Sequence, residues 1–258
     1  MKKGFIVLIL MIIIVSSTSC QVRQNQKPTT YEKSDKASEG LYRIVENIND
    51  IIIDVEKAGK LSATFNESTS LIEADILKEK EKKKEEIKKA WEEINSKIKD
   101  SHESWNKYEK EIMERGATSE YILKFKNSLN GLTVAVENRE NKDIINYGSK
   151  ALFDFSPFLE LYKDEFRGET SRIKYYVYQS YLAGENNELE KAKDLLDMTE
   201  EYTAGLRQKI EDDQKKMKIF EKLVLSLQDM KEAINVGNNN LLKIKRDIIL
   251  QNIKDIEE

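Results

Sequence analysis

The chain has 258 residues, of which 35% are charged and 39% hydrophobic, with 2 prolines, 10 glycines, 1 cysteine and 1 histidine. So few helix-breaking residues among so much Lys, Glu, Leu and Ile predict long helices, while one Cys and one His exclude a Cys/His zinc site and an internal disulfide framework. The formal net charge of −4 argues against a nucleic-acid-binding protein, which usually has a basic surface.

The first twenty residues have the pattern of a secretory signal. Lys2 and Lys3 precede an apolar run from Phe5 to Val15. This run is too short to cross a bilayer as a helix, which needs about 20 residues, but it suits the middle of a signal peptide. Small residues then lead directly to Cys20, the only cysteine of the chain.

A stretch of small residues ending in cysteine after such a run resembles the lipobox of bacterial lipoproteins, although Ser17 stands where that family most often has Leu. The resemblance implies that residues 1–19 are a signal peptide that is removed, and that Cys20 carries diacylglycerol and an amide-linked acyl chain such as palmitate. Two or three chains on one residue anchor a protein stably in a membrane. In the alternative interpretation the signal is of the ordinary kind and Cys20 is incidental.

The residues after Cys20 are polar as far as Ser38, include Pro28 and show no apolar periodicity. They are predicted to form a disordered tether. The predicted organisation is therefore a signal peptide over 1–19, the acylated cysteine and tether over 20–38, and a single α-helical domain over 39–258.

The helical pattern begins at Glu39. Apolar residues recur every three or four positions as far as Ala58, which predicts a helix that stops at Gly59. Residues 60–69 contain Ser, Thr and Asn and are predicted to be a loop.

A second, long helix is predicted from Ser70 to Arg115-Gly116. It passes through Lys78–Glu86, which has no apolar residue and is typical of a solvated helix surface with Glu–Lys pairs four residues apart. A heptad stripe follows and predicts packing against a neighbouring helix. The stripe comprises Ile87, Trp91, Ile94, Ile98, Ser101, Trp105, Tyr108 and Ile112.

Shorter helices rich in aromatic residues are predicted next, and we expect them to form the core. They lie over residues 118–136, 144–155, 158–166 and 170–183, with Thr118 as the first N-cap. Ser156-Pro157 is predicted to begin the third of these helices, because proline is favoured in the first turn, and Arg167-Gly168 to end it.

A second long run of heptad-like spacing extends from Asn187 to Asn235. As one helix it would be roughly 70 Å long, with a bend or break expected near 203–213. Gly237-Asn238 is predicted to stop it, and a last helix follows to Ile256. The fold class is therefore all-α: a multi-helix bundle with two long heptad-bearing helices and shorter aromatic-rich helices between them.

Two other architectures fit parts of the pattern. Tyr175 to Tyr202 resembles a tetratricopeptide hairpin, but no second copy follows at the repeat distance. The heptads are also compatible with a free-standing coiled coil or a homodimer.

No catalytic or nucleotide-binding motif occurs, so we expect no enzyme activity, no cofactor and no metal. His102 lies beside the heptad stripe and is expected to be a structural or exposed histidine. Trp91, Trp105 and the Tyr175/Tyr178 edge are the candidate anchors for a partner, because interface hot spots favour Trp and Tyr. Their helical spacing favours the core, so no partner-binding residue is predicted.

Taken together, the relaxed lipobox at Cys20, the polar tether and the helical body rich in Lys, Glu, Ile and Asn resemble the outer-surface lipoproteins of Borrelia-type spirochaetes, in particular their virulence-associated and complement-regulator-acquiring paralogues. The resemblance implies an outer-membrane protein, lipid-anchored and exposed at the cell surface, that binds a host or vector macromolecule in adhesion or immune evasion. The alternative is a periplasm-facing structural lipoprotein that assembles through its long helices.

Overall fold

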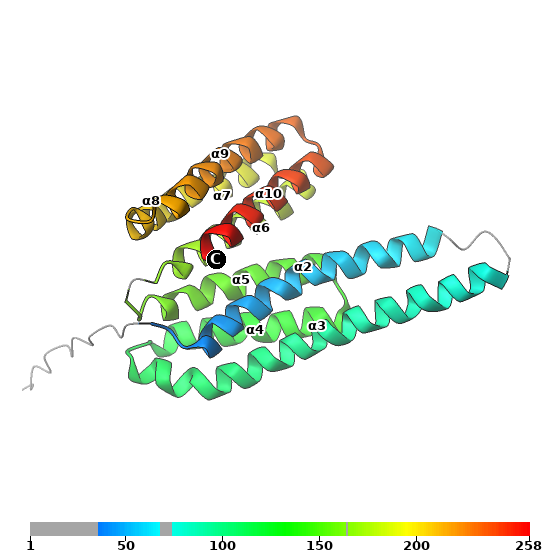
Figure 1. Ribbon diagram of the computed structural model, residues 1–258, viewed down its shortest axis with the longest axis horizontal. Coiled ribbons are helices and arrows are strands. Elements are labelled where there is room, and N and C mark those ends of the chain that lie inside the picture. The colour runs from blue at the N-terminus through cyan, green and yellow to red at the C-terminus, as the bar shows by residue number, and fades with distance from the viewer. Residues whose placement is uncertain (1–35, 68–73, 164) are drawn as a thin grey trace, which may run out of the picture. The chain divides into compact units, whose positions relative to one another are not determined.

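The computed structural model of the protein describes residues 36–67, 74–163 and 165–258 (Figure 1). The predicted signal peptide, Cys20 and nearly all of the predicted tether lie outside the described residues. The described helices belong to one compact unit. Within these ranges every regular element is an α-helix, which confirms the all-α bundle. None of the described helices is both long enough and apolar enough to cross a membrane.

Four helices surround a first hydrophobic core. They are α2 (Glu39–Glu67), α3 (Ala74–Glu114), α4 (Ser119–Asn138) and α5 (Asn141–Leu159). α3 packs along α2 through the predicted heptad stripe, whose residues are all buried except the half-buried Ile87 and Tyr108 (Figure 1). Ser101, the one polar member of the stripe, is fully buried and donates its hydroxyl hydrogen bond to the Lys97 carbonyl at 2.8 Å. The heptad prediction is therefore confirmed, within a bundle rather than in a free-standing coiled coil.

Five helices surround a second hydrophobic core. They are α6 (Arg167–Glu185), α7 (Leu189–Asp197), α8 (Thr199–Ile210), α9 (Gln214–Val236) and α10 (Asn239–Glu257). α6 packs against α5 on one side and against α7, α8 and α10 on others, so it joins the two cores. Gly237 adopts the left-handed conformation, with φ of 66°, and the Asn238 side chain accepts from the Leu241 N–H at 2.9 Å, which confirms the predicted stop between α9 and α10.

Two predicted helix boundaries are wrong. α2 continues through Gly59, where the glycine allows a close approach instead of a helix stop: a Cβ at this position would be 2.6 Å from the Asn141 amide nitrogen. α5 continues through Pro157, although proline lacks the N–H that a helix uses. The carbonyl of Phe153, which Pro157 leaves without its usual donor, accepts the Ser156 hydroxyl at 2.7 Å.

The predicted helix over 158–166 does not form, since α5 ends at Leu159 and Arg167-Gly168 begins α6 instead of ending a helix. The run over 187–235, whose continuity the sequence left open, is divided into α7, α8 and α9. One break, at 211–213, falls in the expected region, and the Asp213 carboxylate caps α9 by accepting from the N–H groups of Lys215 and Lys216, each at 3.0 Å. The other break, at Met198, was not predicted. The division lets α7 and α9 pack against each other.

Candidate functional site

Three of the four aromatic residues considered as partner anchors are core residues. Trp91, Trp105 and Tyr178 are 6%, 4% and 1% exposed. The Trp105 ring lies 4.7 Å from that of Phe125 and 5.2 Å from that of Phe158, between ring centroids. Rings packed in this way stabilise the fold and present no free face to a partner.

His102 is half-buried, and its Nε2 lies 2.8 Å from the Thr133 hydroxyl, which links α3 to α4. Burial lowers its pKa below the ordinary value of 6.5. Among the described residues no carboxylate pairs with His102, and its contact is with the Thr133 hydroxyl. In the part of the chain that the structure describes, no group of three or more His, Cys, Asp or Glu side chains could hold a metal ion.

Half-buried aromatic rings do gather at one surface, formed by α5, α6 and α8. This tyrosine strip comprises Phe153, Tyr175, Tyr176 and Tyr202 together with Arg172. The rings of Tyr176 and Tyr202 stack at 5.7 Å with an angle of 18° between their planes, and Phe153 lies 4.7 Å from Tyr175. The four rings are therefore held in place by one another while part of each remains accessible to solvent.

The strip is neutral apart from one paired cation. Arg172 forms an ion pair with Glu160 and lies 5.3 Å from the Tyr202 ring centroid. Burial, with Tyr176 alongside, raises the pKa of Tyr202 to about 12, and burial also raises the pKa of Tyr175. At neutral pH these tyrosines are uncharged phenols that both donate and accept hydrogen bonds.

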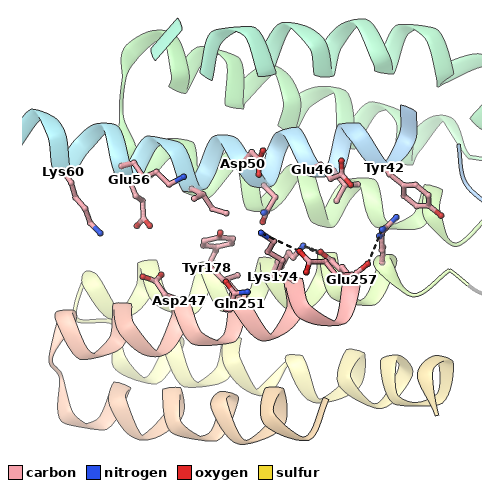
Figure 2. Close-up of a pocket in the computed structure, with 18 residues that line it drawn as sticks. Tyr42, Glu46, Asp50, Glu56, Lys60, Lys174, Tyr178, Asp247, Gln251 and Glu257 are labelled. Carbon is pink, nitrogen blue, oxygen red and sulfur yellow. Dashed lines mark hydrogen bonds and ion pairs between the residues drawn. The ribbon is translucent and has the colours of Figure 1, made fainter. Parts of the chain in front are cut away.

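A separate trough of about 550 Å³ lies between α2 and α10, with α6 forming its floor (Figure 2). Figure 2 shows Glu46, Asp50 and Glu56 along the α2 wall, across from Asp247 and Glu257 on α10. Its apolar lining consists of Val45, Ile53, Leu250 and the rings of Tyr42 and Tyr178. The volume falls in the range of small-ligand sites, about 300–1,000 Å³.

A buried arginine pairs with two of the residues that line the trough, Glu56 and Asp247. Arg246 is 0% exposed and donates to both Glu56 oxygens, at 2.9 and 2.7 Å, and to Asp247 at 2.9 and 2.5 Å. Lys243 donates to Glu56 at 2.6 Å. Burial alone would raise the pKa of Glu56, but the hydrogen bonds and charges of Arg246 and Lys243 outweigh it and lower that pKa. The pair therefore stays ionised and joins α2 to α10.

A second buried cation lies on the floor. Lys174 is 4% exposed and donates to the two carboxylate oxygens of Glu257 at 2.9 and 2.8 Å. Thr170 donates to the same carboxylate at 2.5 Å. Arg167 lies 4.0 Å from the Tyr42 ring centroid, and Tyr42 donates to Glu165. The contacts to Glu257 join α6 to α10, and the contacts of Tyr42 join α2 to the start of α6.

Tyr175 and Tyr178 were named as candidate anchors from the sequence, but neither surface was predicted as a whole, although signals for each exist. Tyr175 and Tyr176 are adjacent, and neighbouring positions on a helix point about 100° apart, so both could not face one core. Arg246 occupies a buried position in the apolar stripe of α10 between Leu242 and Ile249, where an unpaired charge would be costly and a partner carboxylate was therefore to be expected.

Comparison of the chain with protein-family models, with curated proteins and with solved structures finds no significant match in any of the three.

Proposed function

We propose that the protein is a lipid-anchored bacterial surface protein of the spirochaete outer-surface type, that it binds a host or vector protein through the tyrosine strip, and that it has no catalytic role. The anchor and the location are supported by the sequence, in which Cys20 directly follows a signal-like apolar run. The observation that carries the binding part is the strip of half-buried rings around Tyr176 and Tyr202.

The strip has the physical properties of an interface hot spot. Tyr and Arg dominate such sites, because large rings bury much apolar area and their polar ends still form hydrogen bonds. The rings of Phe153, Tyr175, Tyr176 and Tyr202 already pack against one another. Their side chains therefore lose little conformational freedom when a partner covers them, which lowers the entropic cost of association.

The binding proposal is tested by capture from host serum on the immobilised chain, with a double substitution Tyr176→Ser/Tyr202→Ser beside the wild type. Tyr121→Ser is the matched control, because Tyr121 is 42% exposed and lies on α4 outside the strip. We expect a serum protein to be retained by the wild type and the control and lost by the double variant. Equal retention by all three would contradict a role for the strip.

The anchor and the location are tested separately in cells. Radioactive palmitate should label the wild-type protein and should not label the Cys20→Ser variant. Protease added to intact cells should remove the protein together with known surface markers. If it survives until the outer membrane is disrupted, the periplasm-facing structural alternative holds instead.

A further inference from the structure

One hydroxyl that lines the trough makes no hydrogen bond within the described chain. Tyr178 is 1% exposed and lines the trough, and its hydroxyl forms no hydrogen bond to any described residue. The hydroxyl oxygen is not one of the fully buried side-chain atoms that lack a partner, so it is open to the trough and accessible to a ligand that donates or accepts a hydrogen bond. Burial raises the pKa of Tyr178, which leaves the hydroxyl protonated and able to donate.

The charges of the trough leave two groups free, one of each sign. Among the described residues, Glu46 and Lys60 form no ion pair or hydrogen bond through their side chains. Every other ionic side chain that lines the trough has a partner, as Asp50 does in Lys97 at 3.0 Å and Lys57 in Asp54 at 2.9 Å. The free carboxylate and the free ammonium lie near opposite ends of the α2 wall in Figure 2.

The distance between these two groups sets the size of the ligand. They are fourteen positions apart on α2, which corresponds to about 21 Å at 1.5 Å per residue. An extended polypeptide covers that distance with about six or seven residues at roughly 3.3 Å each. Between them the wall and floor present Val45, Ile53 and Leu250, with two neutral polar groups, the Asn49 amide and the Tyr178 hydroxyl, that make no side-chain hydrogen bond within the described chain.

We propose that the trough binds an extended peptide segment of about seven residues, with a basic residue at the Glu46 end, an acidic residue at the Lys60 end and apolar side chains between. The Asn49 amide and the Tyr178 hydroxyl each both donate and accept, as peptide N–H and C=O groups require. A linear polyamine that spanned the trough would place one of its ammonium groups beside Lys60, where the like charges repel. A fatty acid would place its apolar chain between the charged residues of the two walls. Both ligands therefore fit the trough less well than a peptide. This proposal goes beyond the proposed function and depends on neither the anchor nor the tyrosine strip.

The test uses the soluble chain that lacks only the predicted signal peptide and carries Cys20→Ser, titrated calorimetrically with four synthetic heptapeptides. Their termini are blocked and their centres are Val, Leu and Ala. The end residues are Lys and Glu in the first peptide, Lys at both ends of the second, Glu at both ends of the third and Gln at both ends of the fourth. We expect saturable binding that is strongest for the mixed Lys/Glu peptide, by about threefold for each matched end at low salt, and weaker discrimination at high salt.

Substitutions in the protein then show which trough residue recognises which end of the peptide. Glu46→Lys should shift the preference to the peptide with two Glu ends, and Lys60→Glu to the peptide with two Lys ends. The double variant should again prefer the mixed peptide, bound in the opposite direction. Tyr178→Phe, which keeps the ring, should weaken the mixed peptide by about fivefold, the effect of one lost hydrogen bond. Lys82→Glu is the control for the charge change, because Lys82 is 77% exposed on α3 away from the trough.

Each of three results would overturn the proposal: no binding of any heptapeptide at millimolar concentration, equal affinity for all four, or a charge preference that Glu46→Lys leaves unchanged. Circular dichroism and thermal melting of every variant show whether the fold is kept. Because no serum and no lipid enter this experiment, its failure and the failure of the proposed function are distinguishable.

Discussion

Removing one half of the Glu56–Arg246 pair should destabilise the protein more than removing the other half. In Glu56→Gln, a fully buried guanidinium loses a carboxylate to which it donates two hydrogen bonds, at 2.9 and 2.7 Å. Breaking a buried pair in this way costs about 3–5 kcal/mol. Arg246 keeps Asp247, so we expect the lower end of that range, about 3 kcal/mol.

The converse substitution, Arg246→Met, removes the buried charge itself. Glu56 then keeps Lys243 at 2.6 Å, and 21% of its side chain is exposed to water, so it tolerates the loss. We expect a cost of about 1 kcal/mol. The double variant should be no less stable than Arg246→Met alone, which gives a coupling free energy of about 3 kcal/mol or more between the two positions.

Thermal and urea unfolding followed by circular dichroism at pH 7 measure this cycle. For a unit of this size about 3 kcal/mol corresponds to a decrease in Tm of roughly 6–12 °C. Glu120→Gln is the control, because Glu120 pairs with Lys124 on the open surface of α4, and we expect no measurable change. Additive effects of Glu56→Gln and Arg246→Met, or an unchanged Tm in Glu56→Gln, would refute the reasoning.

Four further predictions concern the pH dependence of stability at Glu56 and His102 and the effects of substituting Trp105 and Gly237. The stability difference between the wild type and Glu56→Gln should be full above the ordinary carboxyl pKa of 4.5 and should shrink as the pH falls through the lowered pKa of folded Glu56, as measured by urea unfolding at several pH values. The pKa of His102 in the folded state lies below 6.5, so the unfolded state binds the proton first as the pH falls. The wild type should therefore lose stability relative to His102→Gln below about pH 6.5. Parallel curves of unfolding free energy against pH for the two proteins would contradict this. Trp105→Ala should cost about 3–5 kcal/mol in urea unfolding, whereas Met113→Ala, at a position 50% exposed, should cost little. Gly237→Ala should lower the free energy of unfolding by about 1 kcal/mol, because φ is 66° at this position even though nothing lies close to an added Cβ. An unchanged Tm would show that the turn relaxes to accept alanine.

The stripe of α3 was predictable because its apolar period is regular and α2 packs along it, with rings of α4 and α5 meeting it at Trp105. Two of the helix-boundary errors arose where a common local rule met another contact, one tertiary and one local. Gly59 is commonly a helix stop, yet here Asn141 lies against it. Pro157 is commonly a helix start, yet here the Ser156 hydroxyl occupies the carbonyl that proline leaves free. The Gly59–Asn141 contact joins α2 to α5 and cannot be read from the residues on either side, whereas the Ser156–Phe153 hydrogen bond is local and could have been anticipated.

The continuous run over 187–235 illustrates a different limit. Apolar spacing indicates which face of each segment is buried, but it does not indicate whether the helix axis continues. Asp213 was a visible signal, since an acidic residue on an apolar stripe is typical of an N-cap, and it caps α9. Met198 has no such signal, and the chain breaks there between two segments that each bury their own face.

The two candidate binding surfaces went unpredicted for a reason that concerns α6. This helix packs against α5, α7, α8 and α10, so apolar and polar residues are buried around most of its circumference and no single stripe stands out. Tyr175 and Tyr176 face the strip, whereas Lys174 and Tyr178, four positions apart, share the face that lines the trough. Because the two surfaces use different faces of one helix, substituting Tyr176 leaves the trough unchanged and Tyr178→Phe leaves the strip unchanged. The two binding proposals can therefore be tested independently in the same folded chain.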